Sequence, residues 1–471
     1  MIIHIDKSDN RRFVYQQIYN ELRDIILEKK LSAGDPLPPK RRLASELKVS
    51  INSVTNAYEQ LLAEGYIYSK ERSGYYVEDI TQFTGLEQSG PDNRLPKDLK
   101  EERVQRESYQ YSLSHMSTNL KLFPFKAWIK SEKLAIEHHK DEMSDISHPQ
   151  GPYMVRETIA KLVSLNRGVV CEPEQVVIGP GTQPLIRQVL DMEEFKNSTV
   201  GMENPGYGRM HQLFKDMNLD VLPVSLDRQG LNIDEVKSKK PNVLYITPSH
   251  QFPTGKIMTI SRRIEILNWA AASGVRYVIE DDYDSEFKYG TDNIPSLQSL
   301  DNKTNVIYSG TFSKTLTSSL RISYLVLPPE LLRAYRANYS SIIQGSSTLN
   351  LFTLHYFIKS GEYDKHLKRM NHYYEKIRSA LVKEIKNQYK DRVEITDIPA
   401  GLHFIAKFKS GKSYAEVEQK AKAHRLELYT LERFKIDDSP TEEDRISLVI
   451  GFAKLQEEEI RPVVDVLKQI V

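Results

Sequence analysis

Two different hydrophobic patterns divide this chain of 471 residues. Over residues 13–64 apolar side chains recur every three to four positions, which is the period of amphipathic helices. Beyond about residue 110, short apolar runs such as 176–178 and 277–279 alternate with helical patterns. Several of these runs lack polar alternation, as strands covered on both faces do. The residues between these two regions are rich in turn formers and show neither of the two hydrophobic patterns. We therefore expect two separately folded parts and a linker.

The first part contains a helix, a short helix, a turn, a third helix and a ribbon. The helices are predicted over 13–29, 40–47 and about 51–64, with Ser50 as the N-cap of the third and Gly65 as its end. Residues 66–77 form two short strands around a basic, polar tip. This order predicts a winged helix-turn-helix domain over residues 1–78.

The formal net charge of +1 gives no global argument for nucleic acid, so DNA binding must rest on local clustering and fold. In a helix-turn-helix, the start of the second helix enters the major groove, while basic groups and helix N-termini contact phosphates. Taken singly, each such residue is better explained as part of a solvated face, but the combined order of elements favours DNA. The residues predicted to face DNA are Lys40, Arg41, Arg42, Asn52, Ser53, Asn56, Lys70 and Arg72.

The second part is predicted to be a large α/β domain with a mostly parallel sheet over 111–350, after a linker over 79–110. A long charged helix at about 362–388 and later strands predict a smaller α+β subdomain over 351–471. The mean hydropathy is −0.49, and no apolar run approaches the ~20 residues of a membrane span. The single cysteine, Cys171, excludes an intrachain disulfide and a cysteine metal cluster. We therefore expect a cytoplasmic protein with no membrane association and no metal site.

A lysine in a hydroxyl-rich turn carries the clearest chemistry. Lys314 follows Ser313 just after the apolar run 305–308, and Arg321 comes seven residues later. The amine can form a Schiff base with a phosphorylated aldehyde, while hydroxyls and a guanidinium hold the phosphate. The turn at 181–183 follows another predicted strand and opens a helix, whose amides would add to a phosphate site.

Two further residues would complete such a site. Asp281 follows the strand at 277–279, where a carboxylate could keep a pyridine nitrogen protonated. The phenol of Tyr283 could bond a ring hydroxyl, and Tyr207 ends another apolar run near the same sheet edge. Each motif alone is weak, because glycine turns and polar strand ends are common. Ligands of such sheets nevertheless gather beyond the carboxyl ends of strands, where all these motifs fall.

Within the first part, residues 37–44, 49–50 and 57–66 resemble the winged helix of GntR-type bacterial regulators. The resemblance implies binding to operator DNA. Many members carry arginine directly after the turn's Val-Ser, whereas this chain has Ile51. Arg41 therefore becomes the stronger candidate for a DNA contact.

From about residue 112 onward, the ordered motifs resemble a pyridoxal-phosphate aminotransferase of fold type I: the Gly-Thr-Gln turn, Asn-Pro-Gly-Tyr, Pro-Thr-Gly, Asp…Tyr, Ser-Lys and Arg. The resemblance implies pyridoxal 5′-phosphate as cofactor, with Lys314 as Schiff-base lysine. It further implies Asp281 at the pyridine nitrogen and Tyr283 at the ring hydroxyl. The cofactor-binding residues it implies are Lys314, Asp281, Tyr283, Gly181, Thr182, Gln183, Tyr207, Ser313 and Arg321.

The chain departs from the aminotransferase pattern at two places. Phe252 stands where an asparagine usually binds the ring hydroxyl, so Tyr283 acts alone or with Ser249 or His250. Ser318-Ser319 replaces a common Pro-Gly before the arginine. These changes argue more against efficient transamination than against cofactor binding.

A winged helix joined to an aminotransferase-like domain resembles the MocR subfamily of GntR regulators over essentially the whole chain. The resemblance is closest to the GabR type, which responds to γ-aminobutyrate, and it is carried by the segments 114–117, 147–151, 248–252 and 280–287. Arg209 and Arg433 fall where that type has its two effector-carboxylate arginines. Guanidinium groups suit bidentate recognition of a carboxylate.

The resemblance implies a transcription regulator that senses an amino acid effector, γ-aminobutyrate first, through an external aldimine with the cofactor. It implies a homodimer with a head-to-tail, domain-swapped arrangement on operator DNA. We expect a sensor rather than an enzyme, with room for residual amine exchange or weak transamination. The alternatives are a working aminotransferase with an accessory DNA-binding domain and a regulator that senses pyridoxal phosphate itself.

Overall fold

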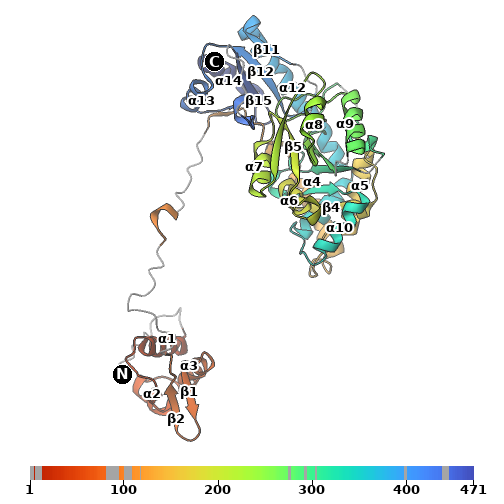
Figure 1. Ribbon diagram of the computed structural model, residues 1–471. Helices are drawn as coiled ribbons and strands as arrows, with labels where there is room; N and C mark the ends of the chain where they lie inside the picture. The colour runs from red at the N-terminus through yellow and green to blue at the C-terminus, as the bar shows by residue number, and fades with distance from the viewer. Residues whose placement is uncertain are drawn as a thin grey trace. The chain divides into compact units, whose positions relative to one another are not determined.

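The computed structural model describes residues 5, 13–80, 95–99, 109–116, 118–273, 277–290, 294–302, 305–396, 400–437 and 445–471. The chain forms two compact units, residues 1–104 and 105–471 (Figure 1). Most of the linker predicted over 79–110 lies outside the described residues. Among the described helices, none combines the length and apolar character that a membrane crossing requires.

The first unit is the winged helix-turn-helix that the sequence predicts. It contains α1 (Val14–Leu27), α2 (Lys40–Leu47), α3 (Ile51–Ala63) and an antiparallel wing of β1 (Ile67–Lys70) and β2 (Gly74–Val77). The apolar periods of the three helices meet in one core that includes Ile18, Leu22, Leu43, Tyr58 and Leu61. Ser50 caps α3, because its Oγ accepts a hydrogen bond of 3.1 Å from the amide of Ser53.

The second unit is built on a seven-stranded sheet. Six strands run in the same direction, and β10 is antiparallel to both of its neighbours. This agrees with the predicted mostly parallel sheet. The strands in spatial order are β4 (Val176–Gly179), β10 (Ser323–Val326), β9 (Val306–Thr311), β8 (Tyr277–Asp282), β7 (Val243–Ile246), β5 (Thr199–Asn204) and β6 (Asp220–Ser225).

Helices cover both faces of this sheet, which explains why β4, β7 and β10 are buried at every position. Consecutive residues of a strand enter different cores, as Val176 and Val177 do. One face packs against α4 (Phe125–His139), α5 (Tyr153–Arg167), α8 (Ile233–Lys239), α9 (Ile260–Ser273) and α11 (Thr348–Lys359). The other packs against α6 (Thr182–Leu190), α7 (Gly208–Asp216) and α10 (Pro329–Tyr339).

A smaller α+β subdomain follows the long helix α12 (Glu362–Tyr389). Its antiparallel sheet has the order β11 (Val393–Ile395), β12 (His403–Lys409), β15 (Arg445–Gly451) and β14 (Tyr429–Thr430). The helices α13 (Tyr414–Ala423) and α14 (Ile460–Ile470) pack on it (Figure 1). Strand β3 (Tyr111–Ser112) pairs with β13 (Leu426–Glu427). Helix α11 crosses the predicted boundary at 350/351 and packs against α4 and α5. The fold class is the one predicted.

Candidate functional site

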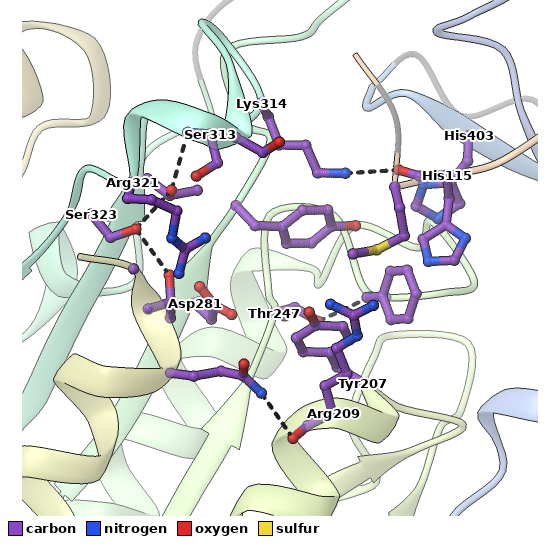
Figure 2. A pocket seen from close by; sticks show the side chains of 18 of the residues that line it. His115, Tyr207, Arg209, Thr247, Asp281, Ser313, Lys314, Arg321, Ser323 and His403 are labelled. Atoms are coloured by element: carbon purple, nitrogen blue, oxygen red, sulfur yellow. Dashed lines mark hydrogen bonds between the residues drawn. The ribbon is translucent and has the colours of Figure 1, made fainter. Parts of the chain in front are cut away.

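A cavity of about 430 Å³ lies beyond the carboxyl ends of the parallel strands (Figure 2). All nine predicted cofactor residues line it, and so does Arg209, whereas Arg433 does not. In Figure 2, Ser313, Arg321 and Ser323 gather at one end of the cavity, and His115 and His403 lie at the other. The remaining lining residues are His115, Met116, Tyr245, Thr247, Phe252, Thr311, Ser318, Ser319, Ser323 and His403.

Lys314 reaches into the cavity from the turn after β9. Its Nζ donates a hydrogen bond of 2.7 Å to the backbone carbonyl of His115. Burial lowers the pKa of the Lys314 amine to about 8, because a desolvated ammonium is disfavoured. A sizeable fraction of the amine is therefore neutral near physiological pH, as a nucleophile must be.

One end of the cavity is suited to a phosphate. Gly181 precedes α6 at φ +130°, and a Cβ there would lie 2.1 Å from Nη2 of Arg321. Only glycine lets this guanidinium approach the start of the helix so closely. The Thr311 hydroxyl accepts a hydrogen bond of 2.8 Å from Ser323. The amides of α6, the guanidinium and these hydroxyls together form a set of anion donors that fits a phosphate group.

Asp281 stands at the end of β8 and is buried. Its carboxylate accepts hydrogen bonds from the hydroxyl of Tyr245 and, at 3.2 Å, from that of Ser309. Burial raises the pKa of Asp281 to about 6. This arrangement fits a protonated pyridine nitrogen, which would favour the ionised carboxylate. Tyr245 was missed because it belongs to the apolar run that forms β7.

Tyr283 also lines the cavity, and the structure identifies its partner. Its hydroxyl lies 3.0 Å from Nδ1 of His250, and the same Nδ1 lies 3.0 and 3.1 Å from the two carboxylate oxygens of Asp284. Ser249, the other partner that the sequence left open, instead accepts a hydrogen bond from the guanidinium of Arg167. Phe252 is buried edge-on against Tyr283, with ring centroids 6.0 Å apart.

The two predicted effector arginines lie on different subdomains. Arg209 is in the first turn of α7, and its side chain is exposed beside the cavity. Arg433 lies on the short 3-10 helix Leu431–Phe434, with its guanidinium 5.2 Å from the ring centroid of Tyr429. The structure brings their segments together, because the amide of Gly206 donates a hydrogen bond of 2.8 Å to the carbonyl of Phe434.

Aromatic rings line the end of the cavity near these segments. His115 lies 5.0 Å from Phe252, 5.0 Å from Tyr429 and 5.2 Å from Phe434, measured between ring centroids. Burial lowers the pKa of His115 to about 3, so this ring stays neutral. The available signal for His115 was that segment 114–117 is one of those on which the predicted resemblance to GabR-type regulators rests.

The predicted DNA-facing residues differ in how free their side chains are. Most are exposed: Arg41, Arg42, Asn52, Asn56, Lys70 and Arg72. Arg42 pairs with Glu46 at 2.8 Å, and the amine of Lys40 lies 4.9 Å from the ring centroid of Tyr75. Ser53 is half-buried, and its Oγ lies 2.8 Å from that of Ser50 within the cap of α3. Lys70 lies 4.5 Å from the ring centroid of Tyr76 on the wing.

Comparison with known proteins identifies both units. Residues 112–467 match the family described as aminotransferase class I and II, and residues 14–77 match the gntR family of bacterial regulatory proteins. The Pyrococcus horikoshii kynurenine aminotransferase structure has a TM-score of 0.68 and 22% identity over 77% of this chain and 91% of its own. That likeness shows the fold of the second unit.

Two relatives share both parts. The uncharacterized HTH-type transcriptional regulator YhdI of Bacillus subtilis (strain 168) is 38% identical over 455 residues, which are 97% of this chain and 95% of YhdI. The probable rhizopine catabolism regulatory protein MocR of Rhizobium meliloti is 29% identical over 403 residues, or 84% of this chain and 82% of MocR.

A GntR-type DNA-binding domain joined to an aminotransferase domain defines a class of bacterial transcription regulators. This chain belongs to that class, the MocR-type regulators of the GntR family. Its cofactor is pyridoxal 5′-phosphate, and the donors around Lys314 suit it.

Proposed function

We propose that this regulator senses a small amino acid, γ-aminobutyrate first, through its pyridoxal-phosphate pocket. The observation that carries the proposal is Lys314, an amine of lowered pKa inside a phosphate-binding cavity that Arg209 borders. A primary amine can replace Lys314, and a carboxylate can meet the arginine. The effector class is therefore an amino acid whose amine and carboxylate lie at opposite ends.

Bound pyridoxal phosphate supplies an aldehyde that condenses with primary amines. In the proposal, Lys314 Nζ would bind that aldehyde carbon, Asp281 would pair with the pyridine nitrogen and Tyr283 would donate a hydrogen bond to the ring oxygen. Tyr207 would contact the ring. The residues that would hold the phosphate all line the cavity: Gly181, Thr182, Gln183, Ser313 and Arg321.

The effector's amine would bind the aldehyde carbon in place of Lys314, which would be left as a free amine, and Arg209 and Arg433 would bind the effector's carboxylate. These arginines come from the large domain and the small subdomain, so a shared carboxylate favours a closed arrangement of the two. The resemblance to GabR-type regulators supports γ-aminobutyrate, whereas the relative MocR is named a probable rhizopine catabolism regulatory protein.

The output is a change in operator binding. Arg41, Lys40, Arg42, Lys70 and Arg72 contact the DNA backbone, and Asn52, Ser53 and Asn56 face base edges. We propose a head-to-tail homodimer that presents two winged helices to two half-sites. Exposed Phe125, Ile129 and Ile136 on α4 are apolar side chains that a second copy would cover.

One titration tests the sensing model. Adding γ-aminobutyrate to the cofactor-loaded protein should change the absorbance of the bound cofactor, and it should change a gel shift on the chain's own upstream DNA over the same concentration range. The Arg433→Ala variant should keep the cofactor and lose the response. If no amino acid in a panel alters either signal, the sensing model fails.

The two alternatives give different results in the same experiment. A working aminotransferase would convert a supplied keto acid steadily, with many turnovers per protein chain. A sensor of pyridoxal phosphate itself would change its DNA binding on cofactor loading and ignore amino acids. Phe252 in place of the ring-binding asparagine disfavours the first alternative.

A further inference from the structure

We propose that His250 is a positioning residue for the cofactor: it holds its proton on Nδ1 toward Asp284 and thereby leaves the Tyr283 hydroxyl hydrogen free to point into the cavity. The proposal deepens the proposed function and rests on pyridoxal phosphate binding beside Lys314. It explains how Tyr283 can bind the ring oxygen without the asparagine whose position Phe252 occupies.

Three oxygen atoms, from one hydroxyl and one carboxylate, lie around one nitrogen. Nδ1 of His250 lies 3.0 Å from the hydroxyl of Tyr283 and 3.0 and 3.1 Å from the two oxygens of Asp284. His250 and Asp284 are both 2% exposed, so water does not compete for these contacts. The third titratable group packed against the imidazole is His403 from β12, with ring centroids 4.8 Å apart.

The position of one proton follows from the chemistry of these groups. A carboxylate only accepts hydrogen bonds, so the hydrogen between Asp284 and Nδ1 belongs to the imidazole. An Nδ1 that carries hydrogen has no lone pair left to accept the Tyr283 hydroxyl. The oxygen of Tyr283 can then only accept at this contact, and its own hydrogen remains available to another acceptor.

The opposite edge of the imidazole supports the same tautomer. Nε2 of His250 is buried and has no hydrogen-bond partner among the described residues. A Cβ on Gly401 would lie 1.9 Å from Cε1, 2.3 Å from Nδ1 and 2.6 Å from Nε2, so backbone packs against the Cε1 corner of the ring, between its two nitrogens. A hydrogen on Nε2 would be a buried donor without an acceptor, which is costlier than a bare lone pair.

The consequence concerns the ring oxygen of the cofactor. Phe252 cannot donate a hydrogen bond, so Tyr283 is the hydroxyl that the cavity offers on that side. His250, held by Asp284, fixes the direction of the Tyr283 hydroxyl. Tyr283 therefore donates to the ring oxygen and stabilises its ionised form.

A measurement on the cofactor-free protein tests the tautomer independently of sensing. In ¹⁵N-histidine-labelled protein, the His250 signal, assigned by its loss in His250→Gln, should show a protonated Nδ1 and an unprotonated Nε2 at neutral pH. A protonated Nε2 would overturn the proposal. Neither result bears on whether an amino acid is sensed.

A second measurement uses the loaded protein and two matched variants. An asparagine amide can occupy the position of Nδ1, whereas a glutamine amide lies nearer that of Nε2. His250→Gln should raise the pH midpoint of the bound cofactor's absorbance change by about one to two units, the size of one hydrogen bond to a charged group. His250→Asn should stay near wild type.

Tyr283→Phe provides the reference for this series. It should raise the midpoint as His250→Gln does, and the double variant should add little to either single change. A merely structural role for His250 predicts equal effects of Asn and Gln or fully additive shifts. Either result would refute the positioning role.

Discussion

At the scale of single residues, the pocket depends on how burial adjusts ordinary side chains. The surrounding protein lowers the pKa of Lys314 to about 8 and raises that of Asp281 to about 6. Both shifts favour the neutral form, as desolvation requires. Lys314 is thus prepared for attack on an aldehyde, while Asp281 regains its charge when a cationic ring nitrogen faces it.

The lowered pKa of Lys314 predicts the pH dependence of cofactor attachment. Only the neutral amine attacks, so the attachment rate of pyridoxal phosphate to the cofactor-free protein should rise with pH and level off above about 8. Stopped-flow absorbance across pH 6.5–9.5, about 1.5 units either side, measures this. The Lys314→Ala variant should show no borohydride-reducible attachment. A rate still climbing at the upper end would contradict the burial argument.

Gly181 gives a second prediction at this scale. A Cβ at Gly181 would lie 2.1 Å from Arg321, and φ +130° already disfavours any other residue. Gly181→Ala should weaken cofactor affinity at least about tenfold, or roughly 1.4 kcal/mol, in a fluorescence titration. Gly208→Ala is the matched control, since a Cβ there meets nothing within 4 Å. Equal affinities for the two variants would show that the phosphate end of the cavity has room for a Cβ at Gly181.

At the scale of elements, the winged helix uses similar side chains differently. Arg41 and Arg42 are adjacent on α2 and both exposed, but Arg42 pairs with Glu46 one turn later. Surface pairs of this kind are weak, yet they still compete with a phosphate for the guanidinium. Arg41 is therefore better placed to contact DNA.

This difference can be measured. Arg41→Ala should weaken operator binding and lower the slope of log affinity against log salt by about one, as loss of one phosphate contact does. Arg42→Ala should have the smaller effect on both quantities. Fluorescence anisotropy at several salt concentrations provides the values. A larger loss for Arg42 would reverse this ranking.

The sequence predicted most elements because apolar periodicity is a local signal. It did not predict that β10 runs against its neighbours, since an apolar run does not encode strand direction. Lys314, Asp281 and Tyr283 could be predicted at the cavity because they belong to motifs, whereas nothing in its apolar run marked Tyr245 as a residue that lines the cavity. The choice between Ser249 and His250 needed the fold, which directs Ser249 toward Arg167 instead.

At the scale of the second unit, the two subdomains are joined beside the cavity. Asn204 donates a hydrogen bond of 2.6 Å to Asp437, and its side-chain oxygen accepts one of 3.1 Å from the amide of Ile436. With the bond between Gly206 and Phe434, these contacts hold Arg433 near the segment that carries Arg209. We call these three hydrogen bonds, between residues 204–206 and 434–437, the joint. Recognition of the effector should depend on this joint more than cofactor binding does.

Asn204→Ala tests that dependence. The change removes both side-chain hydrogen bonds, so effector affinity should fall several-fold, for about 1 kcal/mol, while cofactor affinity stays within a factor of about two. Isothermal titration gives the cofactor constant on the cofactor-free protein and the effector constant on the loaded protein. Asn338→Ala is the control, because that amide bonds to Ala334 within its own helix. A parallel loss of cofactor binding would show that the joint supports the whole pocket.

This joint also has a practical meaning for protein engineering. In the proposed function, the effector's carboxylate meets Arg209 and Arg433 on two short segments, 204–209 and 431–437, while the residues around the phosphate end of the cavity come from other segments. A library confined to these two segments, with the cavity-lining Tyr207 kept unchanged, could change which metabolite a reporter strain detects and leave the cofactor chemistry intact. The regulator would thus divide into a constant reactive part and a short, exchangeable reading part.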